Sequence, residues 1–273
     1  MQGRRQKELE TLRQRIAALE SRPVLAGTSL SADLPLQRQP LLPLPPGVLA
    51  EIFADQPRDA GAALGFAIGL ARGALTRRRP ALLLLQLAEE AQEMGVVYGH
   101  GLSHFGFDPH SLVLARPKTI TELLWAMEEA IACRAVGAVV ADLGRHHKAL
   151  DFTASRRLSL RSAAAGATAL LLRYVREREA SAARFRWRVR PAPSAPMAFD
   201  PRAPGPPRWR VTLEKGRMPG QPVATGDQDD FLEWTTHGFV LADTNDRDGK
   251  AGRQPALPRA HPAALGDGLS QAG

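Results

Sequence analysis

The sequence predicts an α/β fold with a mostly parallel sheet flanked by helices, an N-terminal amphipathic helix and C-terminal antiparallel strands. Three observations support this prediction. Short apolar runs alternate with segments of helical periodicity up to residue 175, which is the pattern of a parallel sheet with helices on both faces. After Ser181, apolar residues instead alternate with arginines at a period of two, as in antiparallel strands with one solvated face. A narrow apolar stripe near the N-terminus predicts the separate helix.

The N-terminal region is predicted to form one amphipathic helix over residues 1–22. Leu12, Ile16 and Leu19 recur there at helical spacing, and charged residues occupy the other faces. A helix of this length is marginal by itself, so its stripe is expected to dock on the chain's own core or on a partner. Residues 23–46 are rich in proline and leucine and are predicted to be an extended linker.

The core is predicted to span residues 47–242. Asp59 is expected to cap its first helix, and Thr119 or Thr121 its second. Residues 243–273 are rich in Asp, Gly, Pro and Ala and are predicted to be a disordered tail. The predicted parallel strands are 48–53, 81–86, 111–116, 136–143 and 167–175, the helices are 59–76, 121–134 and 151–165, and the antiparallel strands are 184–190 and 208–213, with a hairpin from 231–236 and 237–243.

The composition is that of an ordinary globular protein, with 44% apolar and 23% charged residues in 273. No apolar run reaches the roughly 18 residues of a membrane helix, and the first ten residues contain no apolar signal segment. We therefore expect a cytoplasmic protein without a membrane partner. The single cysteine, Cys133, excludes an intramolecular disulfide, and its apolar helical context predicts a packed thiol.

The net charge of +8 is unevenly distributed. Residues 156–217 contain 15 arginine and lysine residues against 4 acidic residues, an excess of +11, so the rest of the chain carries about −3. This excess predicts a basic surface for DNA or an acidic protein, and the alternative is a merely solubilising surface. If exposed, Trp187 and Trp209 would stack bases, although burial in the core is the stronger interpretation. The candidate contact residues are Arg156, Arg157, Arg161, Arg184, Arg186, Arg188, Arg208 and Arg210.

The turn after the first core strand has the position of a phosphate loop but not its residues. In the motif G-x-x-x-x-G-K-[ST], the four defined positions correspond to Gln56, Gly61, Ala62 and Ala63, so only Gly61 is kept. The lysine for the phosphates and the hydroxyl for magnesium are both missing. Asp142, at the end of a buried strand, could hold a nucleotide-bound magnesium through water, or instead cap or pair with an arginine. Gly61 and Asp142 are the candidate nucleotide residues, but no cofactor is expected and ATP is the alternative.

Other acidic and histidine residues carry weaker signals. The acidic pairs 89–90 and 128–129 are expected to be solvated charges, although a carboxylate at Glu89 or Glu90 could activate water. His100, His104, His110, His146 and His147 match no metal-binding motif, so no metal site is expected.

Residues 1 to about 242 resemble the ImuA family, RecA-like accessory proteins of damage-induced mutagenesis in bacteria. The segments in which this resemblance is found are LPPGVLAEIFAD, DAGAALGFAIGLA, YGHGLSHFGFDPHSLVLAR, LLWAMEEAIACRAVGAVVADL, LDFTASRRLSLRSAAAGATALLLR, RWRVRPAPSAP and PRWRVTL. The resemblance implies a RecA-like core and location at the nucleoid during DNA damage. It also implies two partners, an inactive Y-family polymerase homologue and an error-prone DNA polymerase, which together copy past lesions. By similarity to recombinases, the N-terminal helix docks on a subunit or partner.

The sequence departs from a true recombinase in ways that bear on activity. Arg173 stands where recombinases carry a γ-phosphate-sensing amide, and the segments that would hold DNA-binding loops are short. We therefore expect a non-catalytic adaptor that bridges the two polymerases, with the recombinase filament as a further candidate partner. The alternatives are a RecA-like ATPase with a degenerate loop and a basic DNA-binding module.

Overall fold

The computed structural model describes residues 42, 44–197, 200, 202–217 and 228–242. The predicted N-terminal helix and C-terminal tail lie outside these residues, as does nearly all of the predicted linker. The description below concerns the unit that ends at Ala242.

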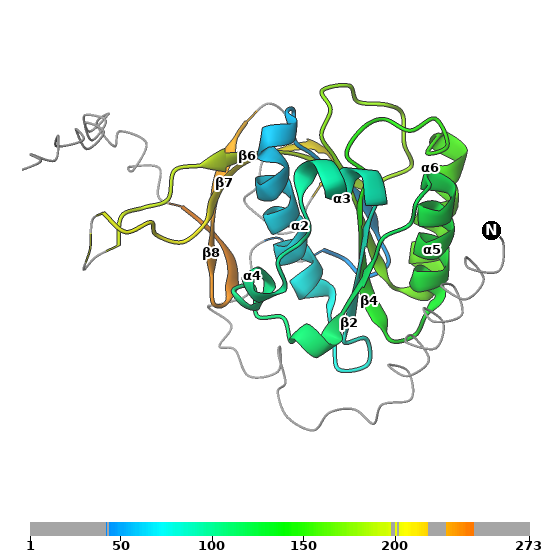
Figure 1. Ribbon diagram of the computed structural model, residues 1–273, viewed down its shortest axis with the longest axis horizontal. Helices are drawn as coiled ribbons and strands as arrows, with labels where there is room; N and C mark the ends of the chain where they lie inside the picture. Colours follow the sequence, from blue (N-terminus) through cyan, green and yellow to red (C-terminus); the bar gives the residue numbers. More distant parts are fainter. Residues whose placement is uncertain (1–41, 43, 198–199, 201, 218–227, 243–273) are drawn as a thin grey trace, which may run out of the picture. The chain divides into compact units, whose positions relative to one another are not determined.

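The described residues form one nine-stranded sheet with the order β3-β2-β4-β5-β1-β6-β7-β8-β9 (Figure 1). The strands from β3 to β6 run parallel, and β6 to β9 pair antiparallel, which confirms the predicted mixed α/β class. The strands are β1 (Leu49–Phe53), β2 (Ala81–Gln86), β3 (Leu112–Ala115), β4 (Val136–Asp142), β5 (Thr168–Arg173), β6 (Phe185–Ala192), β7 (Arg208–Lys215), β8 (Asp230–Thr235) and β9 (Gly238–Leu241).

Helices cover both faces of the sheet, with α2 on one side and α5 and α6 on the other (Figure 1). Alternate residues of the parallel strands therefore enter two different cores. In β1, for example, Ile52 joins the core under α2, whereas Leu49 joins the core under α5 and α6. No described helix is long and apolar enough to span a bilayer. The helices are α2 (Ala60–Ala74), α3 (Ala88–Met94), α4 (Gly99–Ser103), α5 (Ile120–Ala132) and α6 (Phe152–Ala165), with 3-10 turns η2 (Pro57–Asp59) and η3 (Pro109–Ser111).

One of the two predicted helix caps, at the start of α5, is confirmed, and the structure adds a cap at the start of α6 that was not predicted. The side chain of Thr119 accepts a hydrogen bond from Glu122 N at the start of α5, and Asp151 accepts one from Ala154 N at the start of α6. The prediction for Asp59 was wrong, because its side chain makes no capping hydrogen bond. Asp59 belongs to η2, so its backbone is already turned and is not in the extended conformation that a capping side chain needs.

The antiparallel half of the sheet packs its aromatic side chains against α2. Trp187 lies 5.9 Å from Phe66 of α2 between ring centroids, and Phe239 lies 5.1 Å from the same ring. A Cβ on Gly69 would come within 2.4 Å of Phe239, so this close approach requires a glycine on α2. Trp187 and Trp209 are thus core residues, which confirms the stronger of the two sequence interpretations.

Candidate functional site

The position of the phosphate loop is folded as helix. Residues 57–63, which correspond to seven of the eight motif positions, lie in η2 and the first turn of α2. No extended segment remains there to wrap backbone N–H groups around a phosphate. Asp55, just beyond β1, instead accepts a hydrogen bond of 2.7 Å from Arg178 and lies 3.7 Å from Arg190. At this turn the carboxylate of Asp55 is therefore already paired with an arginine of the protein.

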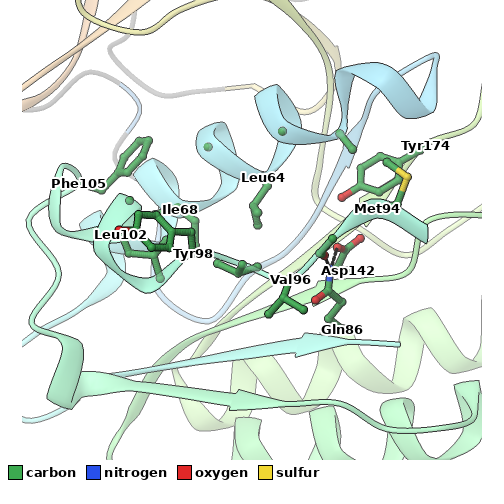
Figure 2. Close-up of a pocket in the computed structure, with 16 residues that line it drawn as sticks. Leu64, Ile68, Gln86, Met94, Val96, Tyr98, Leu102, Phe105, Asp142 and Tyr174 are labelled. Atoms are coloured by element: carbon green, nitrogen blue, oxygen red, sulfur yellow. Dashed lines mark hydrogen bonds between the residues drawn. The ribbon is translucent and has the colours of Figure 1, made fainter. Parts of the chain in front are cut away.

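A pocket of about 300 Å³ lies beside this turn (Figure 2). It contains both candidate nucleotide residues, since Gly61 lies on its α2 wall and Asp142 lies at the end of β4. The segment between β2 and α4 closes the opposite wall. The structure thus brings Gly61 and Asp142 to one place, but the other lining residues are mostly apolar. The full lining is Ala60, Gly61, Leu64, Gly65, Ile68, Gln86, Met94, Gly95, Val96, Val97, Tyr98, Gly101, Leu102, Phe105, Asp142 and Tyr174.

Asp142 is held among polar groups that were not predicted from the sequence. Gln86 Nε2 donates a 3.1 Å hydrogen bond to Asp142 Oδ2, and Tyr174 lies against the same carboxylate. Burial raises the pKa of Asp142, and the charge of Glu90 raises it further, although the donors on Tyr174, Gln86 and Gly144 act in the opposite direction. Burial, followed by the charge of Asp142, raises the pKa of Tyr174 well above its usual value.

Two carboxylates that were expected to be solvated are buried. Glu90 is 5% exposed and its Oε1 accepts a 2.9 Å hydrogen bond from Arg145 Nε. Glu128 is 9% exposed and pairs with Arg157 at 2.5 Å and with Arg161 at 3.3 Å. The solvated interpretation was wrong for both residues because each has a cationic partner from a distant segment, which helical periodicity does not reveal.

Arg173, which was expected at the position of a recombinase's phosphate-sensing amide, is also buried and paired. It is 2% exposed, and its Nη2 donates to Glu179 Oε2 at 3.1 Å. Its guanidinium lies 5.6 Å from the centre of the Phe53 ring, and those of Arg178 and Arg186 lie 4.2 Å and 5.4 Å from the same centre. These arginines anchor the segment after β5 onto the end of β1.

The predicted contact residues on α6 lie at the surface. Arg156, Arg157 and Arg161 are exposed, but Glu128 engages the last two. Among the described residues, Arg156 makes no ion pair. Phe152 and Leu160 are 50% and 61% exposed on the same helix, and neither was predicted as a contact residue. Their spacing from Arg156, four residues on either side, is the signal that could have identified them.

The predicted contact residues on β6 and β7 are mostly paired with acids. Arg186 binds the buried Glu51 at 2.7 Å, and Arg208 binds Glu233 at 2.5 Å. Arg184 is exposed and lies against the ring of Phe185. The two other predicted residues, Arg188 and Arg210, both pair with Asp229.

The histidines are dispersed. His146 pairs with Glu179, and His147 Nε2 lies 2.9 Å from the carbonyl oxygen of Leu143. Within the described ranges, no three His, Cys, Asp or Glu residues gather in a geometry that could hold a metal ion. Cys133 is buried and forms no disulfide, as predicted for a packed thiol.

Comparison with known proteins agrees with the resemblance found in the sequence. No protein-family model matches the chain. Among curated proteins, the chain is similar to protein ImuA from two strains of Caulobacter vibrioides, NA1000 / CB15N and ATCC 19089 / CIP 103742 / CB 15. The identity is 35% over 136 residues, which cover 45% of this chain and 54% of each relative. The chain thus spans about half the length of the curated relatives it matches, and over that span it is similar to protein ImuA.

Proposed function

We propose that this protein is a non-catalytic RecA-like adaptor in DNA-damage-induced translesion synthesis. In this role it bridges an inactive Y-family polymerase homologue and an error-prone DNA polymerase, with the recombinase filament as a further partner. The similarity to protein ImuA supports the biological setting. The helical turn at the phosphate-loop position, with its paired Asp55, supports a scaffold in preference to an ATPase.

The observation that carries the proposal is the outer face of α6. Phe152, Arg156 and Leu160 lie four residues apart, so they form a continuous stripe over two helical turns. Two half-exposed apolar side chains flank the arginine on this stripe, so the face leaves apolar surface in water that a partner would cover. A stripe of this kind suits a partner segment that combines apolar and acidic side chains.

The neighbouring surface fits the same kind of partner. A hollow of about 480 Å³ lies between α5 and α6, and Leu124 and Trp125 provide its apolar lining. Arg157 and Arg161 form part of its wall, where they hold Glu128 and leave positive charge at the edge. An acidic residue of the partner would meet these guanidinium groups, and an apolar residue would enter the hollow.

The proposal is tested by binding of the purified chain to each polymerase partner, measured by calorimetry or biolayer interferometry. The informative variants are Arg156→Glu and the double variant Phe152→Ala/Leu160→Ala, because these side chains support no described ion pair. Arg202→Glu is the matched control, since Arg202 is exposed and lies between β6 and β7, away from α6. We expect each α6 variant to weaken binding of one partner at least tenfold, and the control to leave it unchanged.

Unchanged affinity of both α6 variants for both polymerases would show that the outer face of α6 does not bind these partners. Binding that survives only with DNA present, and that falls steeply with salt, would instead favour the DNA-binding alternative.

A further inference from the structure

We propose that the pocket between α2 and the β2–α4 segment binds a small organic ligand with an N–H donor head, such as an ammonium or amidinium group, on an apolar body. This site is separate from the α6 surface and does not depend on the adaptor function. The inference rests on two buried side chains at one end of the pocket, Asp142 and Gln86. Each presents an oxygen atom that has no hydrogen-bond partner in the described part of the chain.

The orientation of Gln86 is fixed by its surroundings. Its Nε2 donates to the carbonyl oxygen of Gly95 and to Asp142 Oδ2, both at 3.1 Å. Both partners are acceptors. If the amide nitrogen and oxygen of Gln86 exchanged positions, the oxygen would lie against these two other oxygens. Gln86 Oε1 is therefore the atom left without a partner.

Asp142 offers a second acceptor at the same place. Its Oδ2 accepts from Gln86. Tyr174 and the backbone of Gly144 also lie close enough to lower the pKa of this carboxylate, but neither makes a hydrogen bond of full geometry to Oδ1, which has no such partner in the described part of the chain. Asp142 is 3% exposed and Gln86 2% exposed, so bulk water does not cover either group. Leaving a buried acceptor unpaired costs about 1 to 3 kcal/mol. A ligand that donates hydrogen bonds to both oxygens would recover this cost.

The charge around these oxygens opposes a phosphate. Among the described residues that line the pocket there is no lysine or arginine, and the nearby Glu90 adds negative potential at Asp142. Arg145, which pairs with Glu90, also extends to Glu89 at 3.3 Å and to Glu93 at 3.5 Å, so the carboxylates of α3 engage it. An anionic ligand would therefore meet the carboxylate of Asp142 and the amide oxygen of Gln86, whereas a cationic donor would meet complementary groups.

The remainder of the pocket fits an apolar body. Figure 2 shows Asp142, Gln86 and Tyr174 at one end and Phe105, Leu102 and Ile68 at the other. Its volume of about 300 Å³ is at the lower end of small-molecule sites, so a ligand with one or two rings would fill it. The donor head would lie at Asp142, and the rings would extend between α2 and α4.

The test compares two probes of the same shape and opposite charge, benzamidine and benzoate, by ligand-detected NMR titration of the full chain. We expect benzamidine to bind with a Kd of about 1 mM, at least tenfold more tightly than benzoate. Asp142→Asn removes the charge and keeps the shape, and it should reduce benzamidine binding to the level of benzoate. Glu89→Gln is the control, because Glu89 is exposed and lies outside the pocket lining.

The comparison of the two probes requires no variant, so the proposal can be tested even if a substitution impairs folding. Equal binding of both probes, or no binding of benzamidine at 20-fold above the expected Kd, would overturn it. Saturable binding of Mg·ATP that displaces benzamidine and is lost in Asp142→Asn would also overturn it, in favour of a nucleotide site.

Discussion

Arg178 Nη2 donates a 2.7 Å hydrogen bond to Asp55 Oδ1, although the two residues are 123 positions apart in the sequence. Asp55 belongs to the turn after β1, where a phosphate-loop protein would hold the anion of its ligand. Here the anion is a carboxylate of the chain, and an arginine from the segment after β5 neutralises it. The same guanidinium lies 4.2 Å from the centre of the Phe53 ring. This contact fixes the turn without a ligand, which agrees with a scaffold function.

We predict that Arg178→Ala strongly destabilises the protein. Besides Asp55, Arg178 binds Glu214 through Nε at 2.8 Å and the backbone oxygens of Val175 and Arg176 through Nη1. Loss of the side chain removes the nearest cation from two part-buried carboxylates and leaves them only the longer contacts to Arg190 at 3.7 Å and Arg188 at 3.9 Å, so the free energy of unfolding should fall by about 3 kcal/mol. Urea unfolding followed by circular dichroism measures this. Arg176→Ala is the control, since Arg176 is exposed. Equal stability of the two variants would contradict the anchoring role.

Neighbouring arginines on α6 should differ in their effect on stability. Arg157→Glu places a second carboxylate against the buried Glu128, so we expect a loss of about 1 to 3 kcal/mol. Arg156→Glu should change stability by no more than about 0.5 kcal/mol, because Arg156 makes no ion pair within the described residues. Thermal unfolding of both variants in low salt provides the comparison. If Arg156→Glu proved the more damaging, the described pairing would not hold in solution. The same contrast makes Arg156→Glu the cleaner variant for binding experiments.

The order and type of the elements could be predicted from sequence because each signal is local. The run ALLLLQ at residues 81–86 is a buried strand in the structure, as its uninterrupted apolar character indicated. Asp151 caps α6 because it lies at the boundary of a helical pattern, which is also visible locally. By contrast, the short helices α3 and α4 were not predicted, since the Gly- and His-rich segment that contains them lacks a periodic apolar stripe.

The charge of the candidate surface could not be predicted in the same way. The excess of +11 was counted within residues 156–217, but many acids that pair with these arginines come from outside that window. Glu51, Asp55 and Glu128 precede it, and Asp229 and Glu233 follow it. Only the fold brings these residues together, so a local count overestimates the free positive charge. The pairing of Gln86 with Asp142 was missed for a related reason, because it joins the ends of two strands 56 residues apart.

Two glycines of α2 provide a matched pair for the packing between helix and hairpin. Gly69→Ala should lower the free energy of unfolding by about 1 to 2 kcal/mol, because a Cβ there would approach Phe239 to 2.4 Å and Trp234 to 2.9 Å. Gly73→Ala should raise it by about 0.5 to 1 kcal/mol, since nothing lies within 4 Å and alanine favours the helix. Chemical unfolding of both variants measures the difference. Stabilisation by both would show that β9 does not pack as closely as described.

Asp142→Asn should stabilise the protein near neutral pH, by about 1 kcal/mol if it behaves as a typical stabilising substitution. Burial raises the pKa of Asp142 in the folded state above its usual value of 3.8, which applies to the unfolded state. The folded state therefore keeps the proton of this carboxyl to a higher pH than the unfolded state does. Between these two values the folded state binds more protons, and stability falls as the pH rises. Asparagine carries no such charge, so the benefit of the substitution should grow from pH 4 toward neutrality.

Melting temperatures measured from pH 4.5 to 8 test this dependence. Glu90, Tyr174, Gln86 and the backbone of Gly144 face Asp142, and all of them remain in the variant, so the difference between variant and parent isolates the one carboxylate. Glu89→Gln is the control variant, because its side chain is 70% exposed and lies outside this group. A gain for Asp142→Asn that stays constant with pH would show that the effect is one of packing and not of charge. A loss of stability at neutral pH would mean that the carboxylate is favourably solvated, and the pocket would then lack the unpartnered oxygen on which its proposed ligand depends.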